Sequence, residues 1–318
     1  MSEIFDFSKA LMRCHAIYYI IAPGKDKSPK QKYADAVELL AIEQAKYDAM
    51  GERVQGMKSG LTKAAKIAGL EQEIAKLYPK KDDDPLTTGA KSYLKRIYGE
   101  IKYGKYNISK EKGTKYMNKG KMAEQDSIDL INFLDGEKYV KNEIRLQNEF
   151  LSGIPDTFKG ESIDNATHIP DVKTSWDFET FIDNVGKPLN PLYWWQMQGY
   201  FDLTGAKSGE VSYCLVNTPY SIIEEEKFKL AKRLDAVTNE SPEYRLAEAL
   251  LINNMTFDEM PPKERRLKYE VKRDDKAIQQ IHDKIPQCRD YLMEIQELHL
   301  TGYFSDKELP ILETIEEI

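Results

Sequence analysis

Apolar residues recur at helical spacing in the first third of the chain. Between residues 31 and 50 they lie three or four positions apart, at Tyr33, Val37, Leu40, Ala41 and Ala45, which predicts a helix. A second helix is predicted over residues 61–77, after a segment that glycines interrupt. The charged run at residues 80–85, which ends in proline, closes this part of the chain. We therefore expect residues 27–84 to form a helical hairpin.

The remaining sequence alternates between strand-like and helix-like segments. Alternating and β-branched residues predict an antiparallel meander of three strands at 144–151, 155–158 and 168–174, and two more strands at 211–216 and 267–272. Apolar spacing and capping residues predict helices at 88–103, 119–134, 176–181, 188–203, 222–253 and 275–298. Residues 4–22 are predicted to form a short helix with an apolar continuation. This order favours an α/β fold with a mixed sheet of about five strands flanked by helices.

Length and composition limit the classes of protein that the chain can represent. With 318 residues, of which 41% are hydrophobic, it can bury the core of one elaborated domain. Its longest apolar run, residues 16–22, is too short to span a bilayer, and the N-terminus lacks a basic secretory signal. We therefore expect no membrane partner and a cytoplasmic location. Cys14, Cys214 and Cys288 lie far apart in the sequence, which argues against disulfides and against a zinc or iron–sulfur site.

Four short motifs carry the candidate chemistry. In chain order they are Gly120-Lys-Met-Ala-Glu124, Gly153-Ile-Pro-Asp156, Asp171-Val-Lys173 and Gln196-Met-Gln-Gly-Tyr200. Two converging carboxylates such as Asp156 and Asp171 repel each other, so they persist where a divalent cation neutralises them. Lys173 projects from the same strand face as Asp171, because side chains alternate along a strand. Such a combination of acids, ammonium and cation suits attack on a phosphodiester.

The motifs resemble those of the PD-(D/E)XK nuclease superfamily, which run G-x-x-x-E, P-D, (D/E)-x-K and Q-x-x-x-Y in the same order. Within that superfamily the chain is most similar to phage recombination exonucleases of the lambda-exonuclease and YqaJ type. The resemblance implies a phage-encoded or bacterial protein with a restriction-endonuclease-like core formed by residues 1–26 and 85–305. Residues 27–84 would then be an inserted helical subdomain, and residues 306–318 an acidic tail.

The predicted metal site contains only oxygen ligands. Asp156 and Asp171 would hold the metal, the backbone carbonyl of Val172 is a further ligand implied by the resemblance, and Glu124 would complete the site or hold a metal-bound water. Hard oxygen ligands without histidine or cysteine favour Mg²⁺ or Mn²⁺, and we expect two ions.

Three further residues are predicted to act in catalysis. Lys173 would orient or deprotonate the attacking water, with a pKa lowered by the adjacent cation. Gln196 and Tyr200 are four residues apart and therefore share one helix face. We expect them to brace Lys173 and to contact the scissile strand.

The net charge of −7 hides a basic segment that we expect to contact DNA. Residues 101–121 contain seven lysines and only one acid, with tyrosines between them. Lysines neutralise phosphates and aromatic rings accept unstacked bases, although a solvated lysine-rich loop would have the same composition. The predicted DNA-binding residues are Lys110, Lys112, Lys115, Ser8 and Thr174.

One departure from the family pattern leaves the strand polarity open. In lambda-type exonucleases an arginine ahead of the N-terminal serine motif helps to bind the 5′-phosphate. Here Asp6 stands at the corresponding place, ahead of Ser8. Recognition of a 5′-phosphate would therefore be lost or moved, for example to Arg13 or Lys9.

The sequence thus predicts a metal-dependent DNA exonuclease that resects double-stranded DNA ends in phage-type recombination or repair. A single-strand annealing protein and further copies of this chain are the expected protein partners. A structure-specific or restriction-like endonuclease on the same core is one alternative. A catalytically silent DNA-binding or assembly protein is another, although it would be expected to have a broken motif, and all four motifs are intact.

Overall fold

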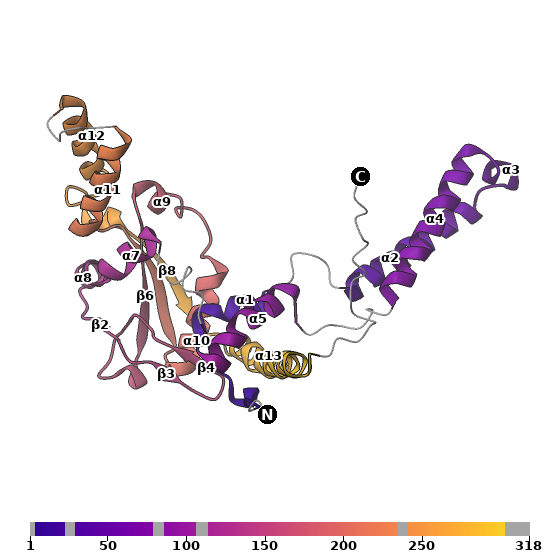
Figure 1. Cartoon of the computed structure of the whole chain (residues 1–318), viewed down its shortest axis with the longest axis horizontal. Coiled ribbons are helices and arrows are strands. Elements are labelled where there is room, and N and C mark those ends of the chain that lie inside the picture. Colours follow the sequence, from indigo (N-terminus) through magenta and orange to yellow (C-terminus); the bar gives the residue numbers. More distant parts are fainter. Residues whose placement is uncertain (1–3, 23–28, 79–85, 106–113, 235–240, 303–318) are drawn as a thin grey trace. The chain divides into compact units, whose positions relative to one another are not determined.

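The computed structural model describes residues 4–22, 29–78, 86–105, 114–234 and 241–302. The chain divides into two compact units (Figure 1). The larger unit comprises Met1–Tyr18 and Arg96–Ile318, and the smaller comprises Tyr19–Lys95. Among the described residues, no helix combines the length and the apolar character needed to cross a membrane.

A three-stranded mixed sheet lies at the centre of the larger unit. Its strands, in spatial order, are β6 (His168–Thr174), β7 (Ser208–Cys214) and β8 (Arg266–Lys272). β6 and β7 are parallel, with Asp171 opposite Val211, whereas β7 and β8 are antiparallel. All three strands were predicted to within a few residues, and their mixed directions confirm the predicted fold class.

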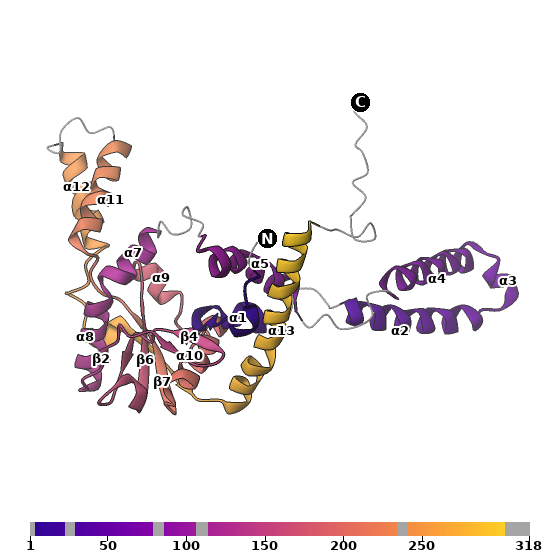
Figure 2. The ribbon, with the colours of Figure 1, turned by 60° about the horizontal axis from the view of Figure 1, so that its bottom comes forward.

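Helices cover both faces of this sheet (Figure 2). On one face α8 (Glu124–Asp135) packs Ile128 and Ile131 against Val172. On the other face lies α10 (Pro191–Thr204), which is so close that a Cβ on Gly209 of β7 would meet Met197 Cε at 2.6 Å. The long α13 (Asp275–Thr301) packs against α10, and Asp274 caps its first turn. Further helices of this unit include α7 (Lys115–Met122), α9 (Phe178–Ile182), α11 (Tyr220–Arg233) and α12 (Pro242–Asn253).

The predicted antiparallel meander is only partly correct. Residues 140–158 form four short strands, β2 (Val140–Lys141), β3 (Leu146–Gln147), β4 (Leu151–Gly153) and β5 (Thr157–Phe158). β3 pairs with β4 and β2 pairs with β5, both antiparallel. β6, however, runs parallel to β7, and its antiparallel contact with the β5 end is one bridge between Lys159 and His168. The five predicted strands therefore belong to more than one small sheet.

Three predicted helices are also interrupted. The helix expected at 119–134 breaks at Ala123, whose φ of −102° and ψ of 13° separate α7 from α8. The stretch 222–253 contains two helices, α11 and α12, and residues 235–240 between them lie outside the described part. The segment 4–22 is mostly not α-helical, because Met12 N donates to Phe150 O at 3.0 Å and places β1 (Met12–Arg13) parallel to β4. Only α1 (Ile17–Ile21) follows the α-helical prediction, after 3₁₀ turns at Phe7–Lys9 and Cys14–Ala16.

The smaller unit contains the two helices predicted in the insertion, α2 (Pro29–Asp48) and α4 (Lys58–Leu77), joined through the short α3 (Glu52–Gln55). Glu43 of α2 is 6% exposed and accepts ion pairs from Lys63 at 3.2 Å and Lys66 at 3.3 Å, which ties the two helices together. The helix at 88–103 is present as α5 (Thr88–Tyr103), and the Thr87 hydroxyl accepts from Ala90 N at 3.2 Å, as an N-cap does. The predicted bounds 1–26, 27–84, 85–305 and 306–318 stay a prediction, and the acidic tail lies outside the described residues.

Candidate active site

Strand β6 delivers one acid and one lysine to the sheet face that α10 covers. Strand side chains alternate, so Asp171 and Lys173 point to this face, while Val172 and Thr174 point to the α8 face. The contacts agree with this division. Gln196 of α10 reaches Asp171, whereas Thr174 Oγ1 lies 2.9 Å from Ser127 Oγ of α8.

Asp156 joins these two residues from a different part of the chain. Lys173 Nζ lies 2.6 Å from Asp171 Oδ2 and 4.0 Å from Asp156 Oδ2. Asp156 follows the end of β4, and Val172 N donates to its Oδ2 at 3.1 Å. The buried Asn142 holds the preceding turn by donating from Nδ2 to Pro155 O at 2.9 Å. The structure therefore brings together the two acids and the lysine that the motifs identified.

Gln196 and Tyr200 form a second layer of polar contacts behind Asp171. Gln196 Nε2 lies 3.3 Å from Asp171 Oδ1 and 2.9 Å from the Tyr200 hydroxyl, which itself donates to Ile154 O at 3.0 Å. These contacts fix Asp171 and the turn that leads to Asp156. The sequence had led us to expect that Gln196 and Tyr200 brace Lys173, but their hydrogen bonds go to Asp171 and Ile154 instead. Lys173 lies over the ring of Tyr193, with Nζ 5.0 Å from the ring centroid.

Two glycines allow this layer to pack closely. A Cβ on Gly153 would meet Cys14 Sγ at 2.8 Å and Tyr200 Cε1 at 2.9 Å. A Cβ on Gly199 would meet Ile17 Cδ1 at 2.4 Å. Both positions thus need glycine because neighbouring side chains occupy the space, and this packing sets the place of Tyr200.

The electrostatics of the site favour a bound cation. Burial and then the negative charge of Asp171 raise the pKa of Asp156 to about 7, although Lys173 opposes the change. Burial alone would lower the pKa of Lys173, but the charges of Asp171 and Asp156 overcome it and raise that pKa. The predicted lowering of the Lys173 pKa depended on an adjacent cation. In the chain by itself the lysine is held as an ammonium, which suits orienting a water better than deprotonating one.

The donor set of Asp156 and Asp171 fits Mg²⁺ or Mn²⁺. Both supply hard carboxylate oxygens, and burial together with the charge of Asp171 raises the pKa of Asp156, so that a divalent cation would favour its ionised form. The Val172 carbonyl stays a predicted ligand. A divalent ion would compete with the Lys173 ammonium for the same carboxylates.

Glu124 is not brought into direct contact with the two aspartates. It is the first residue of α8, and its Oε2 lies 2.7 Å from Lys141 Nζ. The hydrogen bond with Glu124 and, more weakly, the charge of Asp156 raise the pKa of Lys141, so this lysine stands within range of both acids. Within the described ranges, no group of three histidine, cysteine or acidic residues is arranged to hold a metal. The role of Glu124 as a direct ligand thus remains a prediction.

The predicted DNA-binding residues lie in several surroundings. Lys110 and Lys112 fall outside the described residues. Lys115 is engaged within the protein, since its Nζ lies 3.3 Å from Glu226 Oε2 and 4.6 Å from the centroid of a Trp176 ring. Ser8 is exposed and donates from its amide and its hydroxyl to Asp6 Oδ1, at 2.9 and 2.5 Å. Asp6 therefore caps the serine turn, and no arginine takes this position.

A group of basic side chains near the site was mostly missed from the sequence. Arg13 of β1 lies opposite Ser152 of β4, and Arg145 Nη1 donates to Ser152 Oγ at 3.3 Å. The pKa of His15 is lowered, first by desolvation and then by nearby positive charges. These charges belong to Arg13, Arg96, Arg145 and Lys173. Arg13 also pairs with Glu100. The sequence identified Arg13 as a candidate phosphate ligand. It did not identify Arg145, which is more than 130 residues from Arg13 in the sequence, so that no motif contains both.

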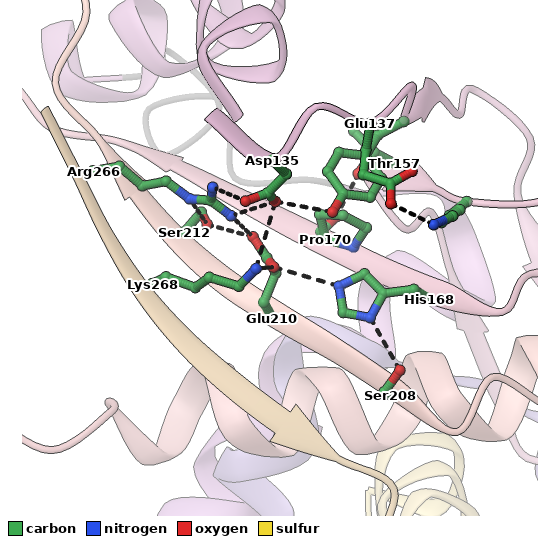
Figure 3. Close-up of polar contacts among 12 residues, drawn as sticks. Asp135, Glu137, Thr157, His168, Pro170, Ser208, Glu210, Ser212, Arg266 and Lys268 are labelled. Atoms are coloured by element: carbon green, nitrogen blue, oxygen red, sulfur yellow. Dashed lines mark hydrogen bonds and ion pairs between the residues drawn. The ribbon is translucent and has the colours of Figure 1, made fainter. Parts of the chain in front are cut away.

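The opposite face of the sheet carries a separate ionic network (Figure 3). The fully buried Glu210 lies 2.7 Å from Lys268 Nζ and pairs with Arg266, which also donates to Asp135 at 2.7 Å. Two acids meet two bases here, so the charges balance. His168 Nδ1 contacts Ser208 Oγ at 3.0 Å on this face, away from Asp171. This network has the character of a structural clamp that fastens β7 and β8 to the end of α8.

This architecture, a mixed sheet with helices on both faces, is a fold also found in an exonuclease of solved structure. The structure is similar to that of a phage-related exonuclease from Haemophilus somnus, with a TM-score of 0.54 and 20% sequence identity over 92% of this chain and 97% of that one. It also matches an alkaline exonuclease from Laribacter hongkongensis, with a TM-score of 0.46 and 16% identity over 68% of this chain and 86% of that one. No family model matches the sequence, and no curated protein matches it either. The fold inferred from the four motifs is thereby confirmed.

Proposed function

We propose that this chain is a metal-dependent DNA exonuclease that hydrolyses phosphodiester bonds at double-stranded DNA ends. The observation that carries the proposal is the convergence of Asp156, Asp171 and Lys173, with the ammonium 2.6 and 4.0 Å from the two carboxylates. The pKa of Asp156, raised to about 7, supports a site that needs a cation. The similarity to a phage-related exonuclease supports the reaction class by analogy of fold.

Each residue then has a defined task. Mg²⁺ or Mn²⁺ held by Asp156 and Asp171 would neutralise developing charge on the phosphate. Lys173 Nζ, as an ammonium, donates a hydrogen bond that orients the attacking water. Gln196 donates to Asp171 and to the Tyr200 hydroxyl, which fixes the carboxylate orientation. Tyr200 donates to Ile154 O and so keeps Asp156, two residues further, at its distance from Asp171.

The basic group provides a path for the DNA backbone. Arg13, Arg145 and Lys173 all lie within electrostatic range of His15, and the two arginines would offer positive charge to phosphates next to the scissile one. This arrangement compensates for Asp6 at the place where lambda-type exonucleases have an arginine. Single-stranded DNA left by such a reaction is the substrate of a single-strand annealing protein, which is the partner class that we propose.

The substrate topology tests this proposal. Purified protein with Mg²⁺ should degrade linear duplex DNA progressively and leave covalently closed circles intact. The Lys173→Ala variant serves as the control for contaminating nucleases. Cleavage of closed circles would identify an endonuclease instead. Binding of duplex ends without degradation of any DNA would identify a silent DNA-binding protein.

A further inference from the structure

Lys173 has a second partner that differs in kind from the aspartates. Its Nζ lies over the ring of Tyr193, 5.0 Å from the centroid, which is within the range of a cation–π interaction. Tyr193 belongs to α10 and precedes Gln196 by three residues, so one helix supplies contacts to both Asp171 and Lys173. The Lys173 side chain is 22% exposed, so water screens this contact only in part.

Metal binding would weaken one of these contacts and spare the other. In the metal-free protein the carboxylates of Asp171 and Asp156 hold the Lys173 ammonium. A divalent ion would neutralise the negative charge of these carboxylates. Lys173 would then stand beside a like charge and lose its ionic anchor. An aromatic face is not a ligand for a hard cation, so the Tyr193 ring keeps its attraction for Nζ.

Other tyrosines fix the Tyr193 ring. The ring of Tyr213 on β7 meets it at 6.1 Å and 69°, and the ring of Tyr269 on β8 meets Tyr213 at 5.7 Å and 73°. The Tyr269 hydroxyl donates to Asn184 O at 2.7 Å, in the loop that precedes α10. Such edge-to-face contacts orient rings and favour one geometry over others. Within the described part of the chain the Tyr193 hydroxyl has no hydrogen-bond partner. The contact between Tyr193 and Lys173 is therefore made by the ring.

We propose that Tyr193 is the positioning residue that holds Lys173 in place to orient the attacking water once metal ions occupy the two aspartates. The inference rests on the proposed phosphodiester hydrolysis and extends it to a residue outside the four motifs. It applies equally to cleavage at DNA ends and within DNA, because Lys173 would assist hydrolysis of a phosphodiester bond in both cases.

Two substitutions at one position separate the ring from the hydroxyl. Tyr193→Phe keeps the face that attracts a cation, and Tyr193→Leu removes it at similar bulk. A desolvated cation–π contact corresponds to about a thirtyfold change in rate, so Tyr193→Leu should lower kcat by about tenfold to thirtyfold. KM for DNA should stay within about twofold, and Tyr193→Phe should restore kcat. Trp194→Leu, which removes a half-buried aromatic from the same helix, should leave kcat unchanged.

The measurement uses full-length protein at saturating Mg²⁺ on whichever DNA topology the wild type cleaves. It therefore separates this inference from the choice between exonuclease and endonuclease. Unchanged kcat in Tyr193→Leu would overturn the inference, as would equal losses in the Phe and Leu variants.

A second readout does not require turnover. Crystals grown with Ca²⁺ should keep Lys173 Nζ within about 6 Å of the ring centroid in the wild type and in Tyr193→Phe. In Tyr193→Leu the amine should move away from this place. A wild-type Nζ that leaves the Tyr193 ring when Ca²⁺ is bound would show that the ring does not hold it.

Discussion

Asp156→Asn should reduce the pH dependence of stability in the metal-free protein. The folded-state pKa of Asp156 is about 7, above the ordinary value of 3.8, because burial and the Asp171 charge disfavour the carboxylate. A group with a raised pKa contributes stability that is fully present below its unfolded pKa and is lost as pH rises through its folded pKa. Metal-free wild type should therefore lose stability from about pH 4 to pH 7. Asparagine is neutral throughout, and its side-chain oxygen can still accept from Val172 N.

The size of the effect follows from the two pKa values. With a pKa of 3.8 in the unfolded and about 7 in the folded state, ionisation of Asp156 between pH 5 and pH 8 lowers the free energy of unfolding by about 2.5 kcal/mol. The Asp156 side chain is 20% exposed, so solvent screens part of this, and we expect a difference of about 1.5–2.5 kcal/mol between wild type and variant. The other titrating groups are common to both proteins and cancel in the difference.

Urea denaturation in EDTA at pH 5, 6, 7 and 8 measures this difference. Tryptophan fluorescence reports on the larger unit alone, because Trp176, Trp194 and Trp195 all belong to it. Asp164→Asn, at an exposed carboxylate, should retain the wild-type slope. Mg²⁺ at pH 8 should stabilise wild type more than Asp156→Asn. Equal pH slopes in wild type and Asp156→Asn would refute the electrostatic reasoning.

Three further predictions concern other residues. Asp171→Ala and Lys173→Ala should each lower turnover on linear duplex at least about a thousandfold, and retained activity in both would remove them from the site. Neutralising Lys110, Lys112 and Lys115 together should make the log–log salt dependence of DNA binding shallower by about 2 units, since each phosphate contact contributes about 0.9 and Lys115 is already engaged with Glu226. An unchanged slope would mean that this segment is a solvated loop. Gly199→Ala should destabilise the fold by about 1–3 kcal/mol through the clash with Ile17, whereas Gly120→Ala, with open space around it, should be tolerated in a thermal melt.

The sequence predicted the long elements and the chemical motifs well, because both depend on local patterns. The spacing of Asp171 and Lys173 in a strand determines that they share a face, and the acidic pair Asp274 and Asp275 marks the start of α13. Short strands were harder to predict. β1 exists because Met12 N finds Phe150 O, a partner almost 140 residues away, and the sequence around Met12 gives no indication of it.

The contacts that refine the site are also long-range. Gln196 was placed correctly on its helix face, but the sequence could not show that it would meet Asp171 and that Tyr193 would meet Lys173. Both contacts depend on how α10 lies across β6. The pairing of Glu124 with Lys141 is likewise set by the position of β2, two residues of strand whose partner is β5.

The most direct test of the central claim is the release of nucleotides from uniformly labelled linear duplex DNA. Wild-type protein with Mg²⁺ should release acid-soluble nucleotides, EDTA should abolish the release, and Ca²⁺ should not support it. Asp171→Asn, which keeps the shape of the site and removes one charge, should be inactive under every condition. Release that persists in EDTA, or in Asp171→Asn with Mg²⁺, would contradict a nuclease site built on Asp156, Asp171 and Lys173.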